Sequence, residues 1–208
     1  MPKGYWIVRG NVTDPEAYKG YVAANAEAFR KFGARFLVRG GKLETPEGES
    51  RSRNVVLAFA DFATAYACYT SPEYMSAKSL RDGKAVSDLI VAEGTDSAPG
   101  PADRSVRGYW IARVDVTDST GYQAYVQADA EAFARYRGRF LVRGGRSELV
   151  EGQARARNVL IEFPDYATAR ACYQSPEYKR AAALRRGKAI FDLIIIEGYA
   201  GPQPSDVR

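Results

Sequence analysis

The stretch RFLVRGG at residues 35–41 occurs again, unchanged, at residues 139–145. The same shift of 104 positions relates residues 4–7 (GYWI) to 108–111, and residues 71–74 (SPEY) to 175–178. Roughly 53 of the 91 positions from 4 to 94 are identical to their counterparts, and the alignment has no gap. A constant offset over a domain-sized stretch is typical of an internal duplication. We therefore expect two copies of one fold in this chain.

Each copy has the pattern of an alternating α/β unit. In the first copy, β-forming residues with period two predict strands at 5–12, 35–39, 54–59 and 88–93. Apolar residues at helical spacing predict a helix from Asp14 to Gly33 and another over 61–70, with a further helical segment from Ser71. The polar stretch after Gly41, which contains Pro46 and Gly48, predicts a long hairpin loop. The resulting order, β-α-β-β-α-β, is the ferredoxin-like unit.

This order predicts the fold class and the domain bounds. We expect an α+β protein with a first ferredoxin-like repeat at 1–94, a linker at 95–107, a second repeat at 108–198 and a flexible tail at 199–208. A ferredoxin-like sheet carries helices on one face only, so two such sheets can bury their open faces against each other. The chain is therefore expected to form an intramolecular dimeric α/β barrel, a pseudo-dimer, and further homo-oligomers remain open.

Composition limits the partners. Hydrophobic residues make up 46% and charged residues 26% of the chain, which is ordinary for a soluble globular protein. No apolar run approaches the roughly 18 residues that span a bilayer, and the start lacks the apolar stretch of a secretory signal. These features predict a cytoplasmic protein without a membrane partner. The net charge is +5, but the basic residues are spread along the chain, which does not favour a nucleic-acid partner.

The chain contains no histidine. This excludes haem sites with a proximal histidine, histidine-based zinc sites, and nucleophiles activated by histidine. The two cysteines, Cys68 and Cys172, occupy equivalent positions on apolar helix faces and are expected to be buried rather than to bind a metal. We therefore expect no metal and no cofactor.

Strand alternation divides the side chains of each predicted sheet into two sets. One set is almost purely apolar and is expected to face the helices. The other set is mixed and is expected to face the space between the sheets. The candidate ligand-binding residues in that mixed set are Arg9, Arg39, Asn54, Arg113, Arg143 and Asn158, and the candidate proton-transfer residues are Asp88, Asp192 and Glu162.

Within this set, Arg39 and Arg143 are the best candidates for holding a carboxylate, phenolate or enolate, because a guanidinium binds such groups in bidentate fashion. A carboxylate would then move a proton, aided by a burial-raised pKa. Tyr74 and Tyr178 are read either as helix packing or as hydrogen-bond donors at a pocket mouth. Arg81 and Arg185, by contrast, are expected on the solvated surface.

The two copies are not chemically equal. Glu162 stands where the first copy has Ala58, and Asp115 stands where it has Asn11. If only one copy carries an active cavity, the Glu162 side is the first place to look.

The combination of repeated motifs resembles a known family. The opening GYWI, the VTD before the first helix, RFLVRGG, the RNVV at 53–56, the SPEY segment, and the EG pairs at 93–94 and 197–198 resemble the domain of unknown function 1330 family. The resemblance implies a dimeric α/β-barrel fold, and usual members carry one such domain where this chain has two. The wider superfamily includes cofactor-free monooxygenases, isomerases, haem enzymes and ligand-binding regulators, so the resemblance implies no single activity.

Two functions are carried forward. The first is a small-molecule-binding barrel, and in its enzymatic form it is a cofactor-free enzyme acting on a small anionic or aromatic substrate. The alternative is a non-catalytic structural or interaction module, in which the inward arginines and carboxylates pair with each other and only specify how the domains dock.

Overall fold

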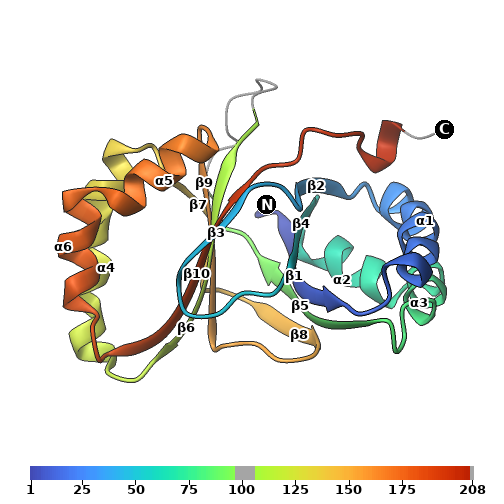
Figure 1. Ribbon diagram of the computed structural model, residues 1–208, viewed down its shortest axis with the longest axis horizontal. Coiled ribbons are helices and arrows are strands. Elements are labelled where there is room, and N and C mark those ends of the chain that lie inside the picture. The colour runs from blue at the N-terminus through green and yellow to red at the C-terminus, as the bar shows by residue number, and fades with distance from the viewer. Residues whose placement is uncertain (97–105, 207–208) are drawn as a thin grey trace.

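The computed structural model describes residues 1–96 and 106–206. The protein is α+β: two similar halves lie side by side, with helices on the outer flanks and the sheets between them (Figure 1). The first repeat contains β1 (Gly4–Val12), α1 (Pro15–Lys31), β2 (Arg35–Arg39), β3 (Leu43–Glu47), β4 (Arg53–Phe59), α2 (Phe62–Thr70), α3 (Pro72–Ser79) and β5 (Ala85–Glu93). The second repeat contains β6 (Gly108–Val116), α4 (Ser119–Arg135), β7 (Arg139–Arg143), β8 (Ser147–Glu151), β9 (Arg157–Phe163), α5 (Tyr166–Gln174), α6 (Pro176–Leu184) and β10 (Ala189–Glu197).

The helices begin where the sequence places capping residues. Asp14 accepts a hydrogen bond from the amide of Ala17, and Asp118 does the same from Gly121 in the second repeat. Ser71 ends α2 and caps α3, with Pro72 in the first turn of α3. A side-chain acceptor at this position satisfies an amide that the helix itself leaves free. The helix boundaries are therefore set locally.

Each sheet includes one strand from the other repeat. The strand orders are β2-β4-β1-β5-β8 and β3-β10-β6-β9-β7, and every pair is antiparallel. The expectation of a long loop after Gly41 was wrong, because β3 reaches across and pairs with β10. Its partner lies some 150 residues further along the chain, so a local sequence pattern carries little sign of it.

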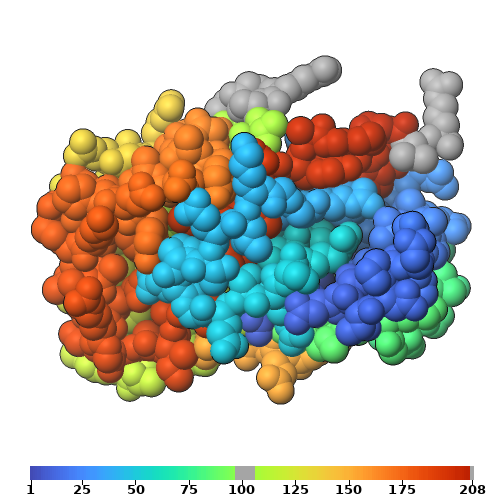
Figure 2. All heavy atoms as spheres, in the orientation of Figure 1, coloured from blue at the N-terminus to red at the C-terminus, as the bar shows by residue number. Residues whose placement is uncertain are grey.

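The crossing strands are fixed to the helices of the other repeat by buried ion pairs. Arg81, just after α3, contacts Glu151 of β8 at 2.6 Å, and Arg185, after α6, contacts Glu47 of β3. The expectation that Arg81 and Arg185 lie on the solvated surface was therefore wrong: each is only 6% exposed. Both arginines are drawn inside because a strand from the opposite repeat brings a carboxylate to them. Figure 2 shows the segment around β3 lying against the opposite half.

The described part of the protein has three apolar cores. Each repeat has one core between its helices and its sheet, around Trp6 in the first repeat and Trp110 in the second. The third lies between the two sheets and joins residues such as Ile7 and Val56 to Ile111 and Leu160. The predicted face-to-face packing of two ferredoxin-like units is confirmed, although the strands form two separate sheets and not a single closed barrel.

The chain beyond Gly198 makes specific contacts, whereas the sequence predicts a flexible tail there. The amide of Tyr199 donates to the carbonyl of Leu37, and its ring contacts Phe36 at 5.7 Å between centroids. The side chain of Gln203 both accepts from and donates to the backbone of Phe36, just before a short 3-10 helix (Pro204–Asp206). The aromatic ring of Tyr199 gives this segment apolar surface to bury. Of the predicted linker, residues 97–105 lie outside the described part.

No helix in the described ranges is long and apolar enough to cross a bilayer.

Candidate functional site

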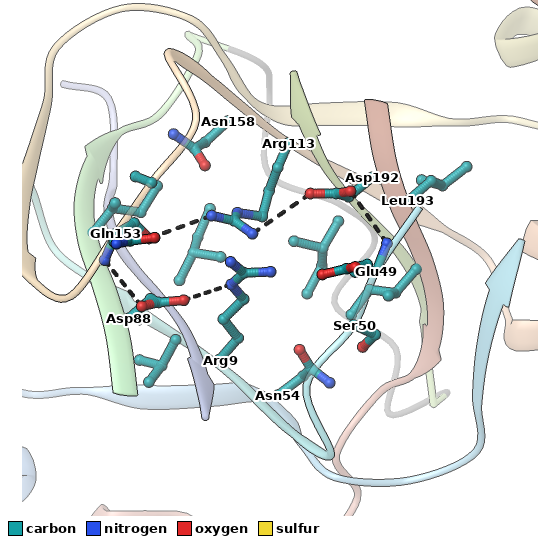
Figure 3. Close-up of a pocket in the computed structure, with 16 residues that line it drawn as sticks. Arg9, Glu49, Ser50, Asn54, Asp88, Arg113, Gln153, Asn158, Asp192 and Leu193 are labelled. Atoms are coloured by element: carbon teal, nitrogen blue, oxygen red, sulfur yellow. Dashed lines mark hydrogen bonds and ion pairs between the residues drawn. The ribbon is translucent and has the colours of Figure 1, made fainter. Parts of the chain in front are cut away.

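The structure gathers six of the predicted site residues between the two sheets. Strand register explains why: Arg9 lies opposite Asn54 on one neighbouring strand and opposite Asp88 on the other. The second repeat aligns its equivalents in the same way, as Asn158, Arg113 and Asp192. Figure 3 shows the guanidinium groups of Arg9 and Arg113 facing one another in the middle of this space.

The two candidate carboxylates in this space, Asp88 and Asp192, are already paired. Asp88 accepts hydrogen bonds from Arg9 at 2.7 Å, from Arg51, and from the amide of Gln153 at 2.9 Å. Asp192 accepts from Arg155 at 2.7 Å and from the amide of Glu49, and Arg113 lies 3.6 Å from it. The remaining cavity measures about 30 Å³, which is room for a water molecule or two.

Electrostatics in this space favour permanent ion pairs. Burial alone would raise the pKa of Asp192, but hydrogen bonds from Arg155 and the Glu49 amide outweigh it and hold that pKa below its ordinary value. Burial and the nearby charge of Arg9 lower the pKa of Arg113 to about 10. A general base needs a raised pKa and a free oxygen, and Asp192 has neither. This arrangement therefore suits docking better than catalysis.

Glu162 lies away from this space. It accepts hydrogen bonds from Arg139 at 2.7 Å and from the Tyr109 hydroxyl at 3.1 Å, near one end of the sheet. Asp115 binds Arg155 and the amide of Ala156, so it anchors the segment that leads into β9. The sequence difference at these two positions therefore changes which structural ion pairs and hydrogen bonds the second repeat forms.

Arg39 and Arg143 do not lie between the sheets as expected. The pairing of β2 with β4 shifts register between Phe36 and Val38, so Val38 joins the inter-sheet core while Arg39 lies on the helix side. The same bulge between Phe140 and Val142 places Arg143 on the helix side of the second sheet. A bulge inserts one residue and reverses the alternation beyond it, which strict period-two counting misses.

This reversal places Arg143 in a second cavity, between α4 and its sheet, which we call the Asp129 pocket. It measures about 70 Å³, and its lining includes Tyr122, Tyr125, Asp129, Arg143, Arg157 and Phe191. The side chain of Asp129 is 6% exposed and lies 3.8 Å from the Arg143 guanidinium. Its Oδ1 atom has no hydrogen-bond partner among the described residues. Burial raises the pKa of Asp129 to about 6, against a smaller opposing effect of Arg143.

The first repeat has an equivalent cavity beneath α1, which we call the Arg39 pocket. It measures about 40 Å³, and its lining includes Tyr18, Asn25, Arg39, Arg53, Tyr74 and Ser87. A surface groove of about 400 Å³ shares Tyr18 and Arg53 with it. Asn25 stands at the position of Asp129, and Ser87 at that of Phe191. The two pockets thus share a frame and differ in charge.

The two predicted tyrosines lie at the bottom of these pockets, not at a mouth. Tyr74 and Tyr178 are almost fully buried, and their hydroxyls lie 3.2 and 3.3 Å from those of Tyr21 and Tyr125. Burial raises the pKa of Tyr178 to about 12, so its hydroxyl stays protonated and can only donate or accept hydrogen bonds. This is closer to the packing interpretation than to that of an acid at a pocket mouth.

The described residues offer no cluster of three or more metal-ligating side chains. Both cysteines are fully buried, and burial raises the pKa of each thiol to about 12, which disfavours the thiolate that binds metals. With no histidine in the chain, these thiols also leave a haem without its commonest protein ligands.

Asp129 and Asn25 were missed from the sequence, although a signal was present. Tyr122, Tyr125, Asp129 and Phe133 recur at helical spacing on the buried stripe of α4. A carboxylate on such a stripe is rarely buried without a partner or a purpose. The duplicated sequence also marks the position, because an amide replaces the acid in the other copy.

The family model of the domain of unknown function DUF1330 matches residues 3–95 and 107–199. No curated protein matches the chain. Among solved structures, a protein proposed to be a chlorite dismutase aligns over 99% of this chain and 97% of its own, with a TM-score of 0.56 and 10% identity. A proposed monooxygenase from Fusobacterium nucleatum aligns over 98% and 97% (TM-score 0.51, 12% identity). An anthrone oxidase-like protein aligns over 96% and 94% (TM-score 0.50, 13% identity).

These likenesses show the fold, which is that of the dimeric α/β-barrel proteins. The family model covers nearly all of both repeats, so the chain belongs to the DUF1330 family and carries two copies of its domain.

Proposed function

We propose that this protein binds a small single-ring molecule with an acidic hydroxyl, a phenol or an enol, in the Asp129 pocket. The observation that carries the proposal is a buried carboxylate with an oxygen that accepts no hydrogen bond from the described residues, set 3.8 Å from a guanidinium in an aromatic cavity. A concave, mostly apolar space with a few placed polar groups is the usual form of a small-molecule site.

The chemistry we propose is a proton transfer that uses no cofactor. The ligand hydroxyl donates to Oδ1 of Asp129, its proton passes to that oxygen, and the electron pair of the O–H bond stays on the ligand oxygen. Arg143 then stabilises the oxyanion. Because its pKa is raised to about 6, Asp129 is a stronger base than an ordinary carboxylate and is still largely ionised at neutral pH.

The size of the pocket limits the ligand. Its roughly 70 Å³ is smaller than the ~150 Å³ cavity that accepts benzene in a model protein. A single ring therefore enters only if side chains at the rim move. Arg157 lies over the ring of Tyr122 at 5.9 Å and is exposed, so this pair is the part of the wall that can swing outward.

The structural neighbours support this class of ligand. One is a proposed monooxygenase and another an anthrone oxidase-like protein. An anthrone is a three-ring aromatic ketone whose tautomer is a phenol, so the name of this neighbour points to an aromatic ligand with an acidic oxygen.

A second role is favoured for the inter-sheet residues. We infer that four residues specify how the two sheets dock: Arg9, Asp88, Arg113 and Asp192. The alternative function, a structural or interaction module, assigns them this role. The supporting observation is that both carboxylates are saturated by guanidinium and amide donors from both repeats. This role coexists with ligand binding beneath the helices.

The test is a titration with 4-nitrophenol, whose phenolate form absorbs visible light. It is made on a chain carrying Arg39→Met, so that the equivalent arginine of the first repeat does not contribute. We expect saturable binding with a rise in phenolate absorbance at a pH where free 4-nitrophenol is mostly neutral. Adding Arg143→Met should weaken binding about tenfold or more, since a hydrogen bond to a charged group is lost.

Adding Asp129→Asn should increase the release of protons to the buffer when the phenolate binds, because Asp129 is no longer there to accept the ligand proton. This release is measured by calorimetry in buffers of different ionisation enthalpy. Arg180→Met is the matched control, because Arg180 is an exposed arginine on α6. The proposal fails if binding does not saturate, or if Asp129→Asn leaves the number of protons released on binding unchanged.

A further inference from the structure

The Arg39 pocket contains two guanidinium groups that lack acidic partners. Neither Arg39 nor Arg53 forms an ion pair within the described residues. The Arg39 guanidinium lies over the rings of Phe36 at 4.4 Å and Tyr199 at 5.7 Å. Arg53 lies over the ring of Tyr18 at 5.3 Å.

The cause is a single exchange between the repeats. In the second repeat, Asp129 gives Arg143 a counter-ion at 3.8 Å. In the first repeat that position holds Asn25, which is neutral and only 6% exposed. The charged side chains lining the Arg39 pocket are therefore both positive, whereas the Asp129 pocket holds two arginines and one carboxylate.

The rest of the pocket suits a ligand with one charged end. Trp6, Tyr21 and Phe29 provide apolar wall, and Ser87 adds a hydroxyl where the second repeat has Phe191. The adjoining surface groove shares Val12, Val22, Tyr18 and Arg53 with the pocket. A positive, partly dry recess of this kind favours an anion over a neutral molecule of the same shape.

We propose that the Arg39 pocket is a separate binding site for a small aromatic carboxylate, held by Arg39 and Arg53. The carboxylate would lie between these two guanidinium groups. The ring would extend into the adjoining groove of about 400 Å³, because the pocket itself measures only about 40 Å³. Arg39 is stacked on Phe36 and Tyr199, so its orientation is set before the ligand arrives. Tyr199 comes from the segment after the second repeat, which makes this site dependent on the whole chain.

The experiment measures binding of benzoate to the full chain by isothermal titration calorimetry, at constant ionic strength and about pH 8, where carboxylates are ionised. Neutral benzamide has the same shape and serves as the control ligand. We expect saturable binding of benzoate and binding of benzamide that is weaker by about tenfold or more. Arg39→Met should abolish benzoate binding, whereas Arg143→Met and the exposed-site control Arg180→Met should leave it within about twofold.

Exchanging the residues at positions 25 and 129 should move benzoate binding from the first repeat to the second. Asn25→Asp supplies Arg39 with a built-in counter-ion and should weaken benzoate binding about tenfold or more. In a chain that carries Arg39→Met, adding Asp129→Asn frees Arg143 and should restore binding in the second repeat. Circular dichroism spectra of each variant check that the fold is kept.

The proposal is overturned if benzoate does not bind the wild-type chain, if benzamide binds equally well, or if Arg143→Met abolishes binding while Arg39→Met does not. The 4-nitrophenol titration is made without Arg39, and it depends on Asp129. The two sites can therefore fail independently of each other.

Discussion

Replacing Asp129 by asparagine should make the protein more stable at neutral and alkaline pH. The side chain of Asp129 is 6% exposed, and burial raises its pKa from the ordinary value of 3.8 to about 6. A raised pKa means that the folded protein holds this proton more tightly than the unfolded chain does. The contribution of Asp129 to stability is therefore greatest below pH 3.8 and is lost as the pH rises to about 6 and beyond.

The magnitude follows from the two pKa values. At 1.36 kcal/mol per pKa unit, ionised Asp129 costs the fold about 3 kcal/mol, and the raised value already includes the attraction of Arg143. Asparagine has nearly the same shape and occupies the equivalent position in the first repeat, where Asn25 is 6% exposed. The Asp129→Asn variant should thus gain up to about 3 kcal/mol at about pH 8 and nothing at the acid end.

The assay is urea unfolding of the wild type and the variant across this pH range, compared as a difference so that other titrating groups cancel. Asn25→Asp is the mirror-image control and should be destabilised as the pH rises. A difference that does not change with pH, or a variant that is less stable than the wild type at about pH 8, would refute the reasoning.

Three further predictions concern other parts of the fold. Glu151→Ala leaves the buried guanidinium of Arg81 without its partner and should lower the free energy of unfolding by about 3–5 kcal/mol, measured by urea unfolding. Gly48→Ala should also destabilise the protein, because φ is +65° there and the added Cβ would lie 2.2 Å from Oδ1 of Asp192; an unchanged melting temperature would contradict this. The two buried cysteines, each with a pKa of about 12, should react with a thiol reagent only after unfolding in urea, and rapid reaction of the native protein would count against it.

The architecture could be predicted from the sequence because its signals are local or repeated. Capping residues such as Asp14 and Ser71 mark the helices, and alternation marks the central strands. The crossing strands β3 and β8 could not be found in this way, because the edges they pair with belong to the other repeat. The burial of Arg81 and Arg185 follows from the same crossing and was missed for the same reason.

The positions of Arg39 and Arg143 and the importance of Asp129 could not be predicted from the sequence, for two physical reasons. A bulge at one residue of β2 and of β7 reverses which face the following arginine occupies, and an unbroken RFLVRGG pattern gives no sign of it. Asp129 was hidden because its neighbours on α4 are apolar, so the helix was read by its stripe alone. Arg39 and Arg143, which were chosen for their chemistry, nevertheless line cavities beneath α1 and α4.

The most direct test of the central claim is a crystal structure of the protein with bound 4-nitrophenol. We predict that the ring lies between α4 and its sheet, with the phenol oxygen within hydrogen-bond distance of both Asp129 and Arg143. A ligand found instead between the two sheets, against Arg9 and Arg113, would contradict the account.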